Sequence, residues 1–114
     1  MSNESYIIDG ARSPIGLKNG KMVGIRSDDL ASMVIKGLIE RNSQIPKDVI
    51  EDVVVGCAFP EGSQGMLMAR GVSILAGLPT ETGAKVVNRF CGSSMDSVHQ
   101  ISQGVIAGDL QAGI

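Results

Sequence analysis

Cys91 lies where an apolar strand pattern over residues 84–90 gives way to a helical pattern that starts at Gly92. A cysteine at the first turn of a helix meets unpaired backbone N–H groups and the positive end of the helix dipole, which favour thiolate over thiol. A thiolate is a nucleophile at neutral pH. No other segment of the chain offers comparable chemistry, so we take Cys91 as the candidate catalytic nucleophile.

The residues after Cys91 support this role. Gly92 permits close approach of a substrate to the backbone, and Ser93 or Ser94 can cap the helix and leave other N–H groups directed at the site. The alternative is a buried cysteine that packs as a small hydrophobe, which is the usual fate of a free cysteine.

The neighbouring reactive residues are poor partners for Cys91. His99 is eight positions away, which along a helix is about 12 Å of rise and about 80° off the same face. It cannot be the local base, and we interpret it as a packed or surface residue. Cys57 ends an apolar run and most simply packs there. Any histidine that activates Cys91 must therefore come from outside these residues.

Composition narrows the class of protein. The 114 residues are 43% hydrophobic and carry 10 basic and 12 acidic side chains with 3% aromatic residues, so one globular domain is expected and nucleic-acid binding has little support. Two cysteines cannot form a disulfide framework or a four-ligand zinc site, so no metal site is expected, and reduced thiols indicate a cytoplasmic protein. Neither a signal peptide nor a membrane span is visible.

Periodicity predicts alternating strands and helices. The expected strands cover residues 6–8, 49–57, 85–90 and the start of a fourth at 110–114, and the expected helices cover residues 27–41, 64–76 and 92–107. The dense run at 53–55 is typical of a central strand covered on both faces. In the last helix, Met95, Val98, Ile101, Ser102 and Val105 share one side.

Three successive strand–helix units predict an α/β fold with a mostly parallel sheet and right-handed crossovers. A sheet that stops as its fourth strand begins leaves an edge uncovered, which is unfavourable for a domain alone. We expect either a piece of a longer protein or a chain that needs a partner.

Other polar candidates have simpler interpretations. Arg12 and Ser13 follow the first expected strand, where a parallel sheet places its ligand crevice, but Pro14 beside them fits a turn. Arg70 lies near the start of the second expected helix. The simplest interpretation is that its side chain is solvated or lies at an interface. The glycines match neither dinucleotide-binding nor phosphate-loop spacing.

Four stretches of the chain resemble the thiolase family, in particular the 3-ketoacyl-CoA thiolases of fatty-acid breakdown. They are residues 10–16 (GARSPIG), 62–70, 75–79 (LAGLP) and 87–95 (VNRFCGSSM), in the order of that family's N-terminal part. The resemblance implies a thiolase-like N-terminal half, with residues 1–114 a partial N-terminal domain that lacks the loop domain and the C-terminal domain.

The resemblance also implies a function. Cys91 would be the acyl-thioester nucleophile of a thiolase that transfers acyl groups to coenzyme A, with CoA as a substrate and no permanently bound cofactor. The activating histidine, the second cysteine and most CoA contacts of the family lie downstream, so the 114 residues alone are not expected to turn over. A dimer would form through the strand that begins at Lys85 and ends at Phe90. The alternatives are a biosynthetic acetoacetyl-CoA thiolase and a non-catalytic oligomerisation or scaffold piece.

Overall fold

The computed structural model describes residues 4–114 as a three-stranded parallel sheet with helices on both faces. In chain order the elements are α1 (Ser27–Arg41), the 3-10 helix η1 (Lys47–Val49), β1 (Ile50–Gly56), the 3-10 helix η2 (Gly62–Gln64), α2 (Met68–Leu75), β2 (Gly83–Val87), α3 (Ser93–Ala107) and β3 (Ala112–Gly113). The strand order is β2-β1-β3, and both pairings are parallel. The predicted α/β class with a parallel sheet is confirmed.

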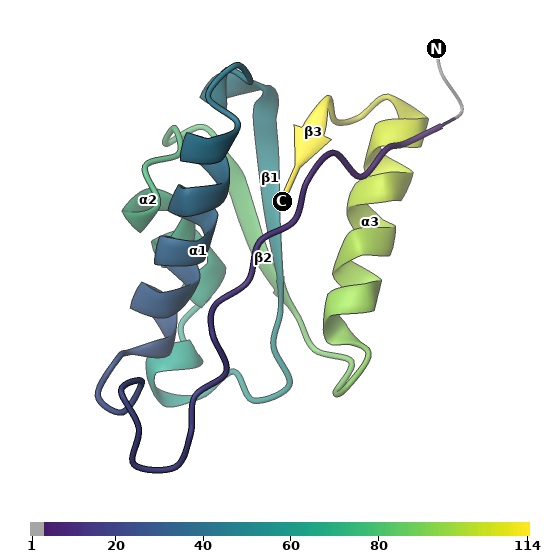
Figure 1. Ribbon diagram of the computed structural model, residues 1–114. Helices are drawn as coiled ribbons and strands as arrows, with labels where there is room; N and C mark the ends of the chain where they lie inside the picture. Colours follow the sequence, from purple (N-terminus) through teal and green to yellow (C-terminus); the bar gives the residue numbers. More distant parts are fainter. Residues whose placement is uncertain (1–3) are drawn as a thin grey trace.

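The sheet separates two helical layers (Figure 1). Helices α1 and α2 cover one face, and α3 covers the other. Strand β1 therefore lies in the centre of the sheet with helices on both sides, as the valine run predicted. This arrangement places the carboxyl ends of β1 and β2 at one edge, because parallel strands end on the same side.

The hydrophobic core lies between the sheet and the α1–α2 layer. Valine and isoleucine from β1 meet aliphatic side chains from both helices and from the turn after α2, and burying each such side chain contributes roughly 1.5–3 kcal/mol. The buried members are Ile35, Ile39, Ile50, Val53, Val72, Ala76 and Leu78.

Helix α3 packs on the opposite face through small polar residues. Ser93 and Ser97 are buried, whereas Met95 is 80% exposed and Val98 is 56% exposed. The interpretation that Met95 and Val98 belong to the packed side of this helix is therefore wrong. The helix approaches β1 too closely for long side chains, so serines occupy the contact.

Residues 6–8 do not form the predicted first strand. Tyr6, Ile7 and Ile8 have no strand assignment and are largely exposed, Ile7 at 86%. An apolar run becomes a strand only when a neighbouring strand satisfies its N–H and C=O groups, and no strand among residues 4–114 pairs with it. Consequently the last strand is the third of the described sheet rather than the fourth.

The segment before α1 is instead held by side chains. Arg41 donates through Nε and a terminal nitrogen to the two Asp9 carboxylate oxygens, each at 2.9 Å, and Asn42 Nδ2 donates to Asp9 at 2.7 Å. These bonds, led by the one from Arg41, lower the pKa of Asp9 from 3.8 to about 2. At the other end of the segment, the Ser5 and Ser102 hydroxyls lie 2.5 Å apart.

The remaining predicted elements are present with shifted bounds. Strand β2 ends at Val87 rather than Phe90, α2 begins at Met68 rather than Gln64, and β3 spans only two residues. Helix α1 has the predicted bounds, and α3 begins one residue late. The shift in β2 matters most, because it leaves Cys91 in a loop instead of directly after the strand.

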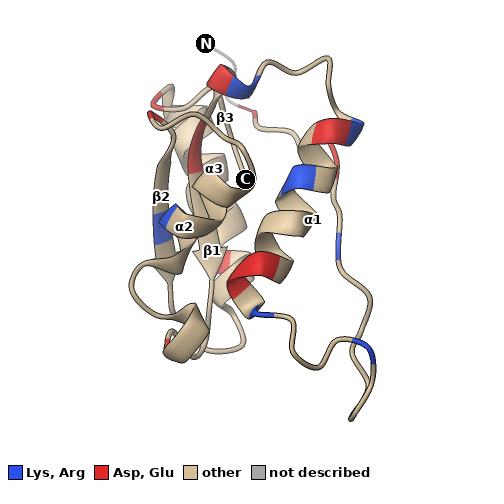
Figure 2. Cartoon of the chain, turned by 90° about the vertical axis from the view of Figure 1, so that its left-hand side faces the viewer, with Lys and Arg blue, Asp and Glu red and all other residues tan. Residues whose placement is uncertain are grey.

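Charges of both signs are spread over the molecule (Figure 2). Acidic and basic residues alternate along α1 in this view, with no continuous basic stripe. Within residues 4–114, no helix is long and apolar enough to cross a membrane.

Candidate active site

Cys91 is an exposed, free thiol in the loop between β2 and α3. The loop leaves the carboxyl edge of the sheet, where open parallel sheets form their ligand crevices. The structure thus places the cysteine at the predicted join of strand and helix, and the alternative of a buried, packed thiol is wrong for the described chain.

The loop turns sharply just before the thiol. Phe90 has a φ of 47°, in the left-handed region that aromatic residues rarely adopt. Its N–H donates to the Asn88 side-chain oxygen at 3.1 Å, and its carbonyl accepts the Ser93 N–H at 3.1 Å. Gly92 N–H donates to the Arg89 carbonyl at 3.0 Å. Non-glycine residues in this conformation persist only where their surroundings hold them, and they cluster at functional sites.

Helix α3 begins two residues after Cys91. The Asp96 N–H donates to the Gly92 carbonyl at 3.0 Å, while the Ser94 and Met95 N–H groups donate no hydrogen bond to any residue in the 4–114 range. These groups and the helix dipole give this end a partial positive charge that favours a nearby anion. No side chain among residues 4–114 caps the helix. The expectation that Ser93 or Ser94 acts as the cap is therefore wrong, because the Ser93 hydroxyl bonds to the preceding loop instead.

Gly56, at the end of β1, sets the position of this helix end. A Cβ atom on Gly56 would lie 2.4 Å from the Ser94 nitrogen and 2.6 Å from the Ser93 carbonyl carbon, distances that real side chains do not reach. The backbone of β1 thus touches the backbone of α3 next to the loop that carries Cys91. Sequence reasoning missed this role of Gly56; its place at the end of the valine run was the available signal.

The other two candidates for site chemistry are His99 and Cys57. His99 is exposed on α3, one and a half turns beyond the helix start. Cys57 is buried and free, and its sulfur accepts a hydrogen bond from Gln64 Nε2 at 3.4 Å. Neither cysteine forms a disulfide bond within the described residues, and Cys57 packs as predicted.

The polar residues of the early loops have structural contacts. Arg12 and Ser13 donate only to carbonyls of residues 13 and 14 within the described chain. Arg70 donates to the Thr82 and Thr80 carbonyls at 2.6 and 2.8 Å. It ties α2 to the turn before β2 and is half-buried, so its side chain has a structural contact within the chain in addition to its partial exposure to solvent.

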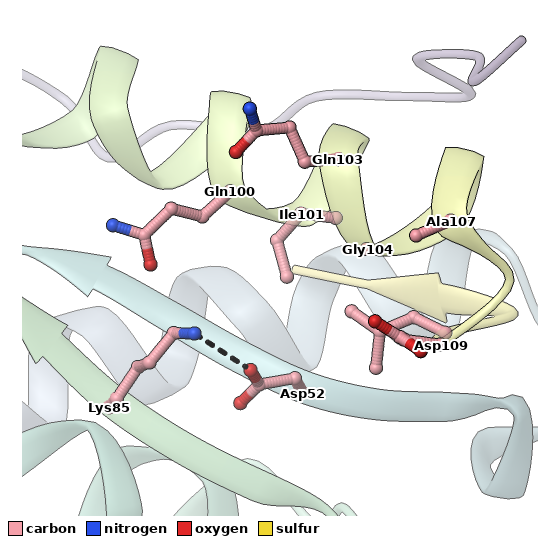
Figure 3. A pocket seen from close by; sticks show the side chains of 9 residues that line it. Asp52, Lys85, Gln100, Ile101, Gln103, Gly104, Ala107 and Asp109 are labelled. Carbon is pink, nitrogen blue, oxygen red and sulfur yellow. Dashed lines mark ion pairs between the residues drawn. The ribbon is translucent and has the colours of Figure 1, made fainter.

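A hollow of about 450 Å³ lies between the second half of α3 and strands β1 and β2 (Figure 3). The Lys85 ammonium and the Asp52 carboxylate face each other across its floor at 3.6 Å, and the Gln100 side chain extends from the helix on the opposite side. Cys91 is not among its lining residues and lies at the other end of α3. This hollow is therefore separate from the candidate nucleophile.

Comparison with known proteins gives a consistent result over the whole described chain. Residues 5–114 match the family model described as "Thiolase, N-terminal domain". The chain is 42% identical to the 3-ketoacyl-CoA thiolase of Marinomonas sp. (strain MWYL1), an alignment that covers 93% of this chain and 27% of that protein. It is 39% identical to the beta-ketoadipyl-CoA thiolase of Escherichia coli, over 93% of this chain and 26% of that protein.

A third relative, the 3-ketoacyl-CoA thiolase of Aliivibrio salmonicida (strain LFI1238), is 43% identical over 90% of this chain and 27% of that protein. The chain thus spans about a quarter of the length of the curated relatives that it matches.

Proposed function

Because this chain belongs to the thiolase family, we propose that Cys91 is the acyl-accepting nucleophile of a 3-ketoacyl-CoA thiolase. The observation that carries the proposal is the exposed Cys91 thiol at the amino end of α3, behind the left-handed turn at Phe90. Two relatives named 3-ketoacyl-CoA thiolase support the acyl-CoA class of substrate.

The proposed reaction has two stages. The Cys91 thiolate attacks the keto carbon of a 3-ketoacyl-CoA and forms a carbon–sulfur bond. The bond between the keto carbon and its neighbour then breaks, and acetyl-CoA leaves as an enolate that takes up a proton. The thiol of a second CoA attacks the acyl-cysteine, receives the shortened acyl group and regenerates Cys91. Donors aimed at the developing oxyanions stabilise both stages.

We expect these 114 residues to form the acyl-enzyme without completing the cycle. The sequence contains one histidine, His99, which faces solvent on α3 and lies about 12 Å of helical rise from Cys91. The general base and acid of the cycle would have to come from residues beyond this sequence.

Acylation can be tested directly by mass spectrometry of the chain after incubation with acetyl-CoA, whose acetyl group passes to the cysteine by thioester exchange with release of CoA and without cleavage of a carbon–carbon bond. We expect an acetyl group on the peptide that contains Cys91, and its absence in Cys91→Ala. The control is Cys57→Ser, which removes the other thiol and should leave acetylation of Cys91 unchanged. The rate of thiolysis, monitored as the loss of acetoacetyl-CoA in the presence of CoA, should not exceed the rate in buffer alone. An unmodified Cys91, in a chain that circular dichroism shows to be folded, would overturn the proposal.

We also propose that the chain associates through β2. This strand lies at the edge of the described sheet, so the N–H and C=O groups on its outer side are available to a second copy of the chain. Sedimentation at two protein concentrations separates a defined dimer from open-ended association. The Cys91→Ala variant should sediment like the unchanged chain. If the chain served only as a scaffold, this variant would keep its whole function.

A further inference from the structure

We propose that Ser93 is the positioning residue for Cys91: its hydroxyl group holds the turn that presents the thiol. This inference rests on the proposed function of Cys91. Ser93 does not reach the reacting atoms through any contact in the structure, and it acts through the backbone of the two residues before the cysteine.

The Ser93 hydroxyl forms two hydrogen bonds that span Cys91. It accepts the Arg89 N–H at 2.8 Å and donates to the Phe90 carbonyl at 2.6 Å. One hydroxyl can do both at once, because it carries one proton and two lone pairs. The side chain is 3% exposed, so water does not compete for these bonds.

These bonds act at the residue whose backbone is strained. Phe90 has a φ of 47°, and its carbonyl is fixed by the Ser93 side chain while its N–H is fixed by Asn88. Loss of the hydroxyl leaves the Arg89 N–H without its acceptor and removes one of the two donors on the Phe90 carbonyl. We infer that the turn then relaxes and that the thiol loses its fixed position ahead of the first turn of α3.

Ser97 provides a matched control one helical turn away. It is also a buried serine of α3, and its hydroxyl donates to the Ser93 carbonyl at 3.0 Å. Its bond stays within the helix and touches no residue of the 88–92 loop. Ser97→Ala therefore removes a similar hydroxyl from the same helix without releasing the turn.

The test compares four chains: unchanged, Ser93→Ala, Ser93→Thr and Ser97→Ala. The first measurement is the rate at which iodoacetamide alkylates Cys91, followed on its own peptide. Because Cys91 is already exposed, a change in this rate reports a change in the position and surroundings of the sulfur rather than its release from burial. The second measurement is hydrogen exchange of the Arg89 amide, and the third is thermal unfolding.

We expect Ser93→Ala to slow alkylation about tenfold and to speed Arg89 exchange about tenfold, as loss of one buried hydrogen bond allows. Ser93→Thr keeps the hydroxyl and should restore both rates, and Ser97→Ala should leave both within about twofold of the unchanged chain even where it lowers the unfolding temperature. If Ser93→Thr does not fold, the contrast between the two alanine variants decides.

Equal effects of Ser93→Ala and Ser97→Ala, or an unchanged alkylation rate in folded Ser93→Ala, would overturn the positioning role. None of the three measurements uses CoA. A chain that shows the expected alkylation order but is never acetylated by acetyl-CoA would contradict the proposed function and leave the role of Ser93 standing.

Discussion

The α-carbon of Gly56 lies in direct contact with the backbone of Ser94, so that a methyl group on Gly56 would be 2.4 Å from the Ser94 nitrogen. The contact joins the carboxyl end of β1 to the amino end of α3. It also fixes the distance between the sheet and the loop that carries Cys91, because Gly56 pairs with Val87, the last residue of β2.

Gly56→Ala should therefore destabilise the chain and disturb the site together. The added methyl group meets backbone atoms, which cannot rotate away, so we expect a loss of about 1–3 kcal/mol in the free energy of unfolding. We also expect slower alkylation of Cys91, since the helix end must shift. Urea unfolding and the iodoacetamide rate measure the two effects.

Gly37→Ala is the control for this substitution. Gly37 lies in α1 with no atom within 4 Å of its added Cβ, so the same change should stabilise the helix by about 0.5–1 kcal/mol. Gly56→Ala with wild-type stability would contradict the close contact.

Ser73→Ala should stabilise the chain. The Ser73 hydroxyl is fully buried in α2 and has no hydrogen-bond partner among the described residues. Its removal relieves the cost of burying an unpaired polar group, and we expect a gain of about 1 kcal/mol in urea unfolding. Thr82→Val is the counterpart, because the buried Thr82 hydroxyl donates to the Ile50 carbonyl at 2.8 Å. Thr82→Val should lower the free energy of unfolding by about 1 kcal/mol. If both substitutions lower the free energy of unfolding, the Ser73 hydroxyl must have a hydrogen-bond partner.

Asp9 should make the free energy of unfolding depend on pH under acidic conditions. Its pKa is about 2 in the folded chain, against an ordinary value of 3.8, and the Arg41 hydrogen bonds are the largest cause of the difference. A lowered pKa means that the folded state binds its proton more weakly, so the stabilisation is complete above the unfolded value and is lost as the pH falls from about 4 to about 2. Asp9→Asn should lack this part of the pH dependence, as measured by urea unfolding across that range.

Because the Asp9–Arg41 pair is exposed, its contribution should shrink in high salt. Arg41→Gln should reproduce the flattened pH profile of Asp9→Asn. If either variant keeps the full acid dependence, another carboxyl group is responsible.

The sequence was sufficient to predict the elements with strong periodicity. Helix α1 has the predicted bounds, and the Val53–Val55 run identified the central strand, because a strand covered on both faces needs apolar side chains in both directions. The position of Cys91 between strand and helix also followed from local pattern. These features depend on residues close together in the chain.

What the sequence could not predict depends on contacts between distant residues. The packed face of α3 was misassigned because Gly56 brings β1 too close for Met95 or Val98 and favours Ser93 and Ser97 instead. The prediction of a strand at residues 6–8 was wrong because apolar character alone does not provide a pairing partner. The end of β2 was misplaced because the bonds of Asn88 and Ser93 turn the chain at Phe90, which single-residue preferences do not reveal.

The contact between Ser5 and Ser102 has a practical consequence for handling the protein. Ser102 is nine residues along α3 from Ser93, about 14 Å of helix. A fusion partner or surface attachment joined ahead of Ser5 therefore lies near the end of α3 that is remote from the Cys91 sulfur. Immobilisation from that terminus should leave the thiol open to reagents and acyl donors.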